Sequence, residues 1–301
     1  MGKIILVGLL ALLAGCDRGS VYSEPVPGAP PNPASSSTVE LRSMLPAEAR
    51  PVGVAITPNG KRYVLDQRSG FYEVGSLSAR LVLNVSGFSG LELTDVVALD
   101  DNRFAFTAEN DGFLFDLRTN DFVSYFCYLP SLPPEPMAGT GGGPGVAPVT
   151  TPLSISQALE LEGVQVKQRT ESVAYNPDSL QLFAQPRTFR LDTGAIAGSE
   201  LFVFDDGGGE PVRVEPMSSA TYVAGGMATL PGDRLLLGAR NRIDELRRVI
   251  ALDPDSLQSE LVPVRALDSA IDITGMARTP SGELWILDGA AQRLIRIDGA
   301  L

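Results

Sequence analysis

The sequence predicts an all-β fold, a β-propeller of five or six four-stranded blades, on two observations. The first is an internal repeat: VGVAITPNGKRYVLD, at 52–66, aligns without a gap on TGMARTPSGELWILD, at 274–288. The second is the form of each unit, which has three or four short apolar runs separated by turns of Gly, Pro, Asn and Asp. Such a unit has two faces to bury and unpaired edges, so it is unstable alone. Units of about 40–50 residues that bury one another's faces radially form a propeller.

Five repeats start near Val52, Thr94, Glu171, Gly225 and Thr274. In the first repeat we expect strands at 52–57, 62–66, 71–74 and 79–85, because Pro-Asn-Gly and Arg-Ser-Gly between them form turns. The second repeat covers 93–117, with a fourth strand at 121–129. The third begins at 171, and the fourth begins at 224 and continues through 247–253 and 259–264.

The last repeat shows only three strands and ends almost at the terminus of the sequence. A strand at 39–44, before the first repeat, is expected to supply the fourth strand of that blade and so close the ring. Closure of this kind explains why the first and last repeats look alike.

A Pro- and Gly-rich insertion at 130–170 interrupts the repeats, and we expect a short helix or strand at 155–166 within it. A degenerate sixth blade in this insertion is the alternative to five blades. The Gly-rich part is not a phosphate-binding loop of the Gly-Lys-Ser/Thr type, because no such sequence follows it.

The composition excludes several classes of function. The 301 residues carry a formal net charge of −12, which argues against a nucleic-acid partner. The absence of histidine excludes Ser-His-Asp and Cys-His-Asn triads and histidine-ligated zinc or iron. Only oxygen-ligated cations such as Ca²⁺ or Mg²⁺ remain as metals.

The N-terminus reads MGKIILVGLLALLAGC, a lysine followed by a short apolar core, which is typical of a secretory signal. Its end, Leu-Ala-Gly-Cys, resembles the lipobox of bacterial lipoproteins. The resemblance implies that residues 1–15 are a signal peptide and that Cys16 carries the acyl chains, palmitate among them. An ordinary cleaved signal is the alternative. We therefore expect a lipid-anchored protein of the bacterial cell envelope that faces the periplasm, on either the inner or the outer membrane.

Residues 16–47 are rich in Pro, Ser, Gly and Ala and are expected to form a flexible tether to a propeller domain at 48–301. The second cysteine, Cys127, has no intramolecular disulfide partner if Cys16 is acylated, so we expect a buried free thiol. We expect the propeller to be monomeric.

The repeats resemble the NHL and SMP-30/gluconolactonase-like superfamily of propellers, with Gly53–Asp66 and Gly275–Asp288 as the best matches. Most of the shared Gly, Pro and Asp residues are simply turn formers. In SMP-30-like enzymes a glutamate that opens an inner strand belongs to a divalent-metal site, and Glu171 in ESVAYNP is the nearest match. The resemblance thus implies Ca²⁺, with Glu171 and Asp95 as candidate metal ligands.

Propellers bind ligands around the central channel, on loops carried by a rigid scaffold. Residues that open the first strand or end the second strand of each repeat are therefore the candidates for ligand binding: Asp66, Asp95, Glu109, Glu171, Arg187, Arg240 and Asp288. Two functions fit this set. The first is a membrane-anchored module that binds an envelope protein or polymer; the second is a Ca²⁺-dependent lactonase or phosphoesterase that uses carboxylates in the channel. The incomplete ligand set favours the first, a protein that is not an enzyme.

Overall fold

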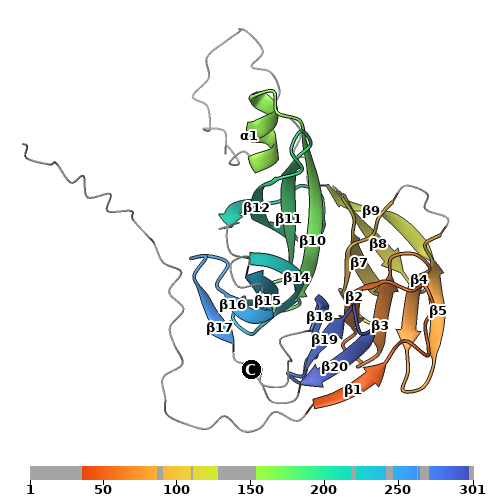
Figure 1. The fold of residues 1–301 in the computed structure, drawn as a ribbon. Coiled ribbons are helices and arrows are strands. Elements are labelled where there is room, and N and C mark those ends of the chain that lie inside the picture. The colour runs from red at the N-terminus through yellow and green to blue at the C-terminus, as the bar shows by residue number, and fades with distance from the viewer. Residues whose placement is uncertain are drawn as a thin grey trace, which may run out of the picture.

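The computed structural model describes residues 36–86, 91–109, 111–127, 154–217, 222–241, 247–262, 264 and 271–297. Within them the chain forms five four-stranded antiparallel sheets, which are arranged radially as the blades of a propeller (Figure 1). The predicted fold class is confirmed, with five blades in the described part of the chain.

We name the blades A to E and give their strands from the axis outwards. Blade A consists of β18 (Ile273–Arg278), β19 (Leu284–Asp288), β20 (Arg293–Ile297) and β1 (Ser36–Glu40). Blade B consists of β2 (Pro51–Ile56), β3 (Arg62–Asp66), β4 (Gly70–Val74) and β5 (Ala79–Asn84). Blade C consists of β6 (Asp95–Ala98), β7 (Arg103–Thr107), β8 (Asp111–Asp116) and β9 (Asp121–Cys127). Blade D consists of β10 (Val166–Asn176), β11 (Gln181–Arg190), β12 (Ile196–Asp205) and β13 (Arg213–Met217). Blade E consists of β14 (Tyr222–Thr229), β15 (Leu235–Asn241), β16 (Arg247–Leu252) and β17 (Ser259–Val262).

The strands of blade B lie within one residue of the predicted ranges because their turns are encoded locally. Between β2 and β3, Gly60 donates its N–H to the carbonyl of Thr57 at 2.8 Å. Gly60 adopts a φ of 84°, a conformation that favours glycine. The turn therefore fixes where both strands end.

The ring is closed as predicted, by a strand from the N-terminal side that joins the last blade. Strand β1 pairs with β20 in antiparallel register, from Ser36 opposite Ile297 to Glu40 opposite Arg293. The predicted range of 39–44 is displaced, because residues after Glu40 form a helical turn in which Leu45 donates its N–H to the carbonyl of Leu41 at 2.9 Å. Leu41 and Leu45 are buried in the core between blades A and B, and this burial favours the turn over a longer strand.

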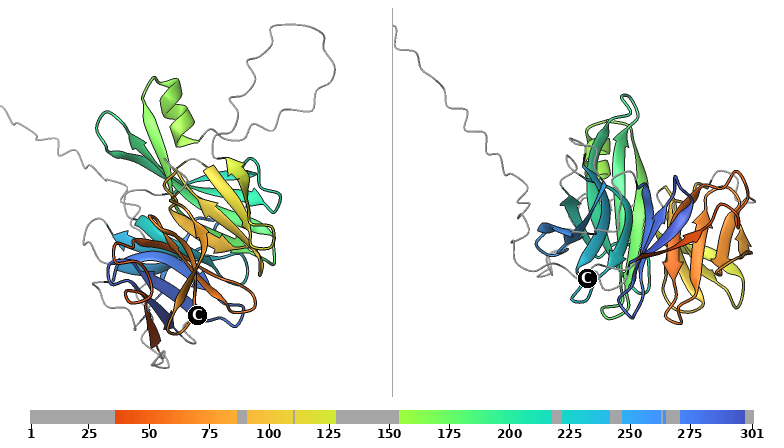
Figure 2. Two further views of the ribbon diagram at one scale, coloured as in Figure 1. Left: turned by 90° about the vertical axis from the view of Figure 1, so that its right-hand side faces the viewer. Right: turned by 60° about the horizontal axis from the view of Figure 1, so that its bottom comes forward.

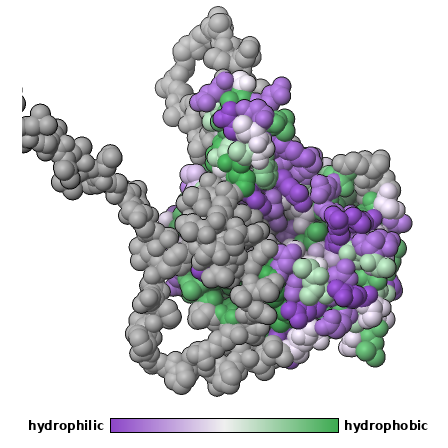
Figure 3. Space-filling view, in the orientation of Figure 1, coloured by the Kyte–Doolittle hydropathy of each residue, from purple (hydrophilic) through white to green (hydrophobic). Residues whose placement is uncertain are grey.

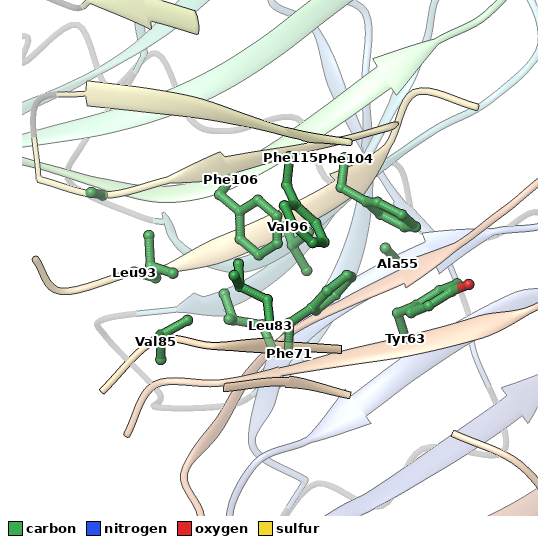
Figure 4. Packing of buried hydrophobic residues seen from close by; sticks show 12 residues of the cluster. Ala55, Tyr63, Phe71, Leu83, Val85, Leu93, Val96, Phe104, Phe106 and Phe115 are labelled. Carbon is green, nitrogen blue, oxygen red and sulfur yellow. The ribbon is translucent and has the colours of Figure 1, made fainter. Parts of the chain in front are cut away.

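The hydrophobic core lies between neighbouring blades, as the radial arrangement requires. Between blades B and C, Phe71 lies 5.0 Å from both Phe104 and Phe106, centroid to centroid, in edge-to-face contacts (Figure 4). All three rings are fully buried, and each contributes roughly 2–3 kcal/mol of transfer free energy. In Figure 3 hydrophilic residues cover much of the right-hand part, where Figure 1 places β4, β5, β8 and β9, with smaller hydrophobic patches among them.

The inner strands β2, β6, β10, β14 and β18 finish around one cavity at the same end of the channel. We call the end where they begin the proximal end and the end where they finish the distal end. Near the proximal end each inner strand has one residue at an equivalent place, which we call the ring position: Gly53, Asp95, Ser172, Gly226 and Gly275. A Cβ on Gly275 would lie 2.9 Å from the backbone N of Val54, and one on Gly53 would lie 2.6 Å from Oδ1 of Asp95. Glycine at this position therefore lets the inner strands of blades A, B and C pack closely.

Blade D departs from the other blades in size. Its three inner strands have 11, 10 and 10 residues, and the extra length lies at the proximal end. Helix α1 (Ile155–Leu161) packs on the extension, as Figures 1 and 2 show at the top of the molecule. The predicted helix or strand at 155–166 is thus a helix over its first seven residues.

Several predictions concern residues outside the described part of the chain. These residues include 1–35, with the predicted signal peptide and Cys16, and 128–153 of the predicted insertion. Cys127 ends β9, but its side chain is outside the described part as well. Among the described helices, none is long and apolar enough to cross a membrane.

Candidate functional site

Asp66 and Asp288 end the second strands of blades B and A, and both carboxylates bind backbone amides. Asp66 is fully buried; it accepts hydrogen bonds from the N–H groups of Arg50 and, at 2.7 Å, Ser69. Asp288 repeats this pattern, since it accepts the N–H groups of Asp272 at 3.3 Å and Ala291 at 3.1 Å. In each blade the carboxylate joins the turn after the second strand to the segment before the first. Their predicted role in ligand binding remains a prediction, and their contacts are those of blade construction.

Asp95 occupies the ring position of blade C and bridges two blades. Its Oδ1 accepts the N–H of Val96 at 2.8 Å, and its Oδ2 accepts the N–H of Val173, on β10, at 3.0 Å. The side chain is 1% exposed, and burial raises the pKa of Asp95 well above its ordinary value, against the opposing effect of the two hydrogen bonds. The carboxyl group thus links blade C to blade D at the place where blades A and B rely on glycine.

Glu171 and Arg187 meet at the proximal end of blade D. Nη2 of Arg187 lies 2.8 Å from Oε2 of Glu171, and both side chains are largely buried, with 10% and 17% exposed. Arg169 approaches the other oxygen, Oε1, at 4.0 Å. Glu171 lies at a β-bulge of β10, between Thr170 and Ser172, and this irregularity directs its side chain toward Arg187.

A row of polar side chains continues from this pair across two further blades. Arg169 approaches Glu92 at 3.4 Å, and Glu92 accepts a hydrogen bond from Nε2 of Gln67 at 2.7 Å. We call the five residues Gln67, Glu92, Arg169, Glu171 and Arg187 the charged band. It joins blades B, C and D at the proximal end. Two of its members, Glu92 and Arg169, are solvent-exposed, with 44% and 37% of their side-chain surface accessible.

The two remaining candidates are not members of this band, although the carbonyl of Glu109 accepts the N–H of Thr170, the residue between Arg169 and Glu171, at 3.2 Å. Glu109 follows β7 and pairs with Lys167 of β10, and both side chains are exposed. The backbone of Arg240 is paired in β15, but its side chain lies outside the described part of the chain. Of the predicted set, the structure therefore pairs Glu171 with Arg187 and places Glu109 next to this pair, at the strand segment 167–170.

The predicted metal ligands do not fit a calcium site in this arrangement. Ca²⁺ takes six to eight oxygen ligands. Both oxygens of Asp95 already accept backbone N–H groups, and Glu171 faces two arginines. Among the residues that the structure describes, no group of three or more Asp, Glu, His or Cys side chains is placed to hold a metal ion.

Two features were missed by sequence reasoning. The first is Glu200, on β12, which is 2% exposed beneath α1 and accepts the N–H of Ile155 at 2.8 Å. Burial raises the pKa of Glu200 to about 7, although the hydrogen bond from Ile155 opposes the shift. No signal in SELFVFDD predicts this burial, because a glutamate within a strand is expected to face water.

The second missed feature is a cavity of about 340 Å³ at the distal end of the channel, lined by the ends of all five inner strands and the turns after them. A signal for it was present. Four repeats place a proline one or two residues after the end of the inner strand, at Pro58, Pro177, Pro231 and Pro280, and these prolines lie around the cavity. By itself the pattern predicts turns and not a cavity.

The searches of protein-family models and of curated proteins gave no match. Solved structures similar to this chain include a gluconolactonase from Xanthomonas campestris, with 12% identity and a TM-score of 0.48 over 84% of this chain and 73% of that one. They also include regucalcin, a calcium-binding protein from Agrobacterium tumefaciens, with 11% identity and a TM-score of 0.42 over 78% of this chain and 66% of that one. A carbohydrate-active enzyme of family AA12 from Trichoderma reesei has 9% identity and a TM-score of 0.48 over 89% and 96%. These are likenesses of fold alone.

Proposed function

We propose that this chain is a lipid-anchored binding module of the bacterial cell envelope. Its propeller binds an envelope protein or polymer at the proximal end, through the charged band and the extended blade D. The sequence supports the anchor, because Leu-Ala-Gly-Cys ends a short apolar signal and several acyl chains give stable attachment to a membrane.

The charged band carries the proposal for the binding surface. Its five side chains form a continuous hydrogen-bonded and ion-paired row over three blades, so they are held in place before any partner arrives. Preorganised polar groups lose less conformational freedom on binding, and complementary charges direct a partner into register. Blade D adds surface at the same end, with α1 and the β11–β12 hairpin. Blade D departs from the repeat through its longer strands and the added helix α1. Binding sites are often built from such additions to a rigid scaffold.

The anchor is tested by metabolic labelling with palmitate. The wild-type protein should incorporate the label, and the Cys16→Ser variant should not. Equal incorporation by both proteins would contradict the lipid anchor, but it would leave the binding surface to be judged by its own experiment.

The binding surface is tested by chemical cross-linking in intact cells, followed by purification of the full chain. Arg169→Glu reverses the charge of an exposed band member and should reduce the capture of the partner at least tenfold, since unfavourable charge juxtaposition costs several kcal/mol. Arg80→Glu is the matched control: Arg80 is also exposed and pairs with Glu73, but it lies on the outer strand of blade B. Equal capture by both variants would reject the charged band as the surface, and digestion of the captured material with protease or glycosidase distinguishes a protein from a polymer.

The alternative, a Ca²⁺-dependent lactonase or phosphoesterase, makes a different prediction. A protein that binds Ca²⁺ only when folded must melt at a higher temperature when the ion is present, by linkage. On the binding-module proposal the melting temperature is the same in Ca²⁺ and in EDTA. A rise in Ca²⁺ that disappears in Glu171→Gln would favour the metal enzyme instead.

A further inference from the structure

The cavity at the distal end is separate from the charged band and has its own chemistry. Its volume of about 340 Å³ lies at the lower end of the range for small-molecule sites, roughly 300–1,000 Å³. It is formed by residues downstream of the ring position in every blade, so it occupies the distal part of the channel. A rigid ring of five inner strands thus encloses a site of small-molecule size.

The wall of the cavity is polar and apolar in about equal parts, and buried methionines and alanines form the apolar part. Met227 and Met276, both buried, contribute to it from blades E and A, and Ala55 and Ala174 contribute from blades B and D. Methionine is polarisable and flexible, and it adapts its shape to an apolar ligand. This part of the cavity suits a compact hydrocarbon body.

One cation lies in the cavity without an ionic partner. Arg278, at the end of β18, forms no ion pair or hydrogen bond with any residue that the structure describes, and its Nε–H is buried without an acceptor. Nη2 lies close to the turn of its own hairpin, 3.3 Å from the place that a Cβ on Gly282 would take. A buried donor without an acceptor costs free energy, which a carboxylate bound beside Arg278 would recover.

The acidic residue that lines the cavity does not neutralise the charge of Arg278. Asp178 is the single acidic side chain among the lining residues, and it is exposed at the rim, in the turn after β10. Water screens a charge in that position. The cavity therefore combines an apolar part, around Met227 and Met276, with a partly buried positive charge.

We propose that the distal cavity binds a small organic anion, a monocarboxylate with a compact aliphatic body. Its carboxylate contacts the guanidinium of Arg278, and its hydrocarbon part contacts Met227 and Met276. This site does not depend on the proposed partner surface, which lies at the other end of the propeller.

The methionines allow a site-specific test in the full-length protein held in lipid nanodiscs. With ¹³C-labelled methionine methyl groups, hexanoate should shift the signals of Met227 and Met276 and leave those of Met44 and Met217 unchanged, because neither of the latter lines the cavity. Hexanol and hexylammonium serve as probes of equal length without the negative charge. Hexanoate should bind at least tenfold more tightly than either, since hydrogen bonds to charged groups are the stronger ones.

The role of Arg278 is tested with Arg278→Gln, which should weaken hexanoate binding roughly tenfold and remove its advantage over hexanol. Arg234→Gln is the matched control: Arg234 follows the turn after β14, at the same end, and pairs with Glu260 outside the cavity. Unchanged methionine signals without ligand would show that each variant is folded. Equal binding of hexanoate and hexanol, equal loss in both variants, or no shift of Met227 and Met276 at millimolar hexanoate would each overturn the proposal.

Discussion

Blades A and B differ from blade D in how their sequences depart from the repeat. In blades A and B the repeated residues Gly275 and Gly53 allow close packing, and Asp288 and Asp66 bind the same pair of backbone segments. Blade D has a serine at the ring position and Pro186 where blades A and B have their aspartates, and Arg187 follows one residue later. It adds an ion pair, a buried glutamate and longer strands. Repetition therefore identifies residues that build the propeller.

The converse does not hold, because a departure from the repeat is not by itself a functional site. Asp95 replaces a glycine at the ring position, yet its carboxyl group joins two inner strands by hydrogen bonds to backbone N–H groups. The charged band also departs from the repeat, but Glu92 and Arg169 within it reach the solvent. The buried Asp95 is therefore interpreted as structural, whereas the solvent-exposed residues of the charged band remain candidates for binding.

Substitutions at the ring position are expected to change the free energy of unfolding most, and to do so differently in blades A and D. Gly275→Ser should lower the free energy of unfolding by more than about 3 kcal/mol, because the new Cβ would lie 2.9 Å from the backbone N of Val54. The reverse change in blade D, Ser172→Gly, should cost only about 1 kcal/mol, from the loss of one hydroxyl and added chain entropy. Urea denaturation measures both, with Gly207→Ala as a control, since a Cβ there meets nothing within 4 Å. Equal losses of unfolding free energy in Gly275→Ser and Ser172→Gly would show that blades A and D do not differ in how closely their inner strands must pack.

The second expected effect is that Glu200 makes the free energy of unfolding depend on pH. Its folded-state pKa of about 7 lies above the unfolded value near 4.3, so the folded state holds the proton more tightly. Its contribution to stability is fully present below about pH 4 and is lost as the pH rises to about 7, by roughly 3 kcal/mol. Glu200→Gln should keep the hydrogen bond from Ile155 and flatten the dependence of unfolding free energy on pH.

The chain is well suited to this measurement because it has no histidine, so few groups titrate between about pH 5.5 and 8. Urea denaturation at several pH values in that range compares Glu200→Gln with wild type and with Glu260→Gln, whose carboxylate is exposed. A wild type and a Glu200→Gln variant with the same pH dependence would show that Glu200 is ionised in the folded state at neutral pH.

The smallest effect concerns the two equivalent aspartates. Asp66→Ala and Asp288→Ala should each cost about 2 kcal/mol, since each leaves backbone N–H groups without a charged acceptor. The two losses should be similar, because each carboxylate joins the same two backbone segments of its blade, although Asp288 also pairs with Arg293 and Asp66 also accepts the hydroxyl of Ser69. A much larger loss for one of them, measured by urea denaturation, would mean that the two blades are not equivalent.

The sequence predicts the blades well where turns are encoded locally. In blade B the turn residues are sufficient to place the strands within one residue, as Gly60 illustrates. Ring closure also followed from the missing fourth strand of the last repeat, although the burial of Leu41 displaced the closing strand to 36–40.

The candidate site was less predictable because it depends on neighbouring blades. The hydrogen bond from Val173 to Asp95 joins residues 78 positions apart, and no local pattern specifies it. Glu200 is buried by a helix that comes 40 residues earlier in the chain, so the strand alternation gave no indication of burial. The distal cavity lies among alanines, methionines and prolines, which resemble structural residues in a sequence.

Ring closure by β1 and β20 has a consequence for the order of synthesis. Strand β1 is made among the first 40 residues, but its partner, β20, ends at Ile297. A nascent chain therefore carries β1 unpaired until β20 has left the ribosome. If synthesis stops before Arg293, blade A lacks β20 and the ring stays open. The ring thus closes only after β20 has been made, and a copy that lacks β20 exposes an unpaired edge by which it can be distinguished from a finished one.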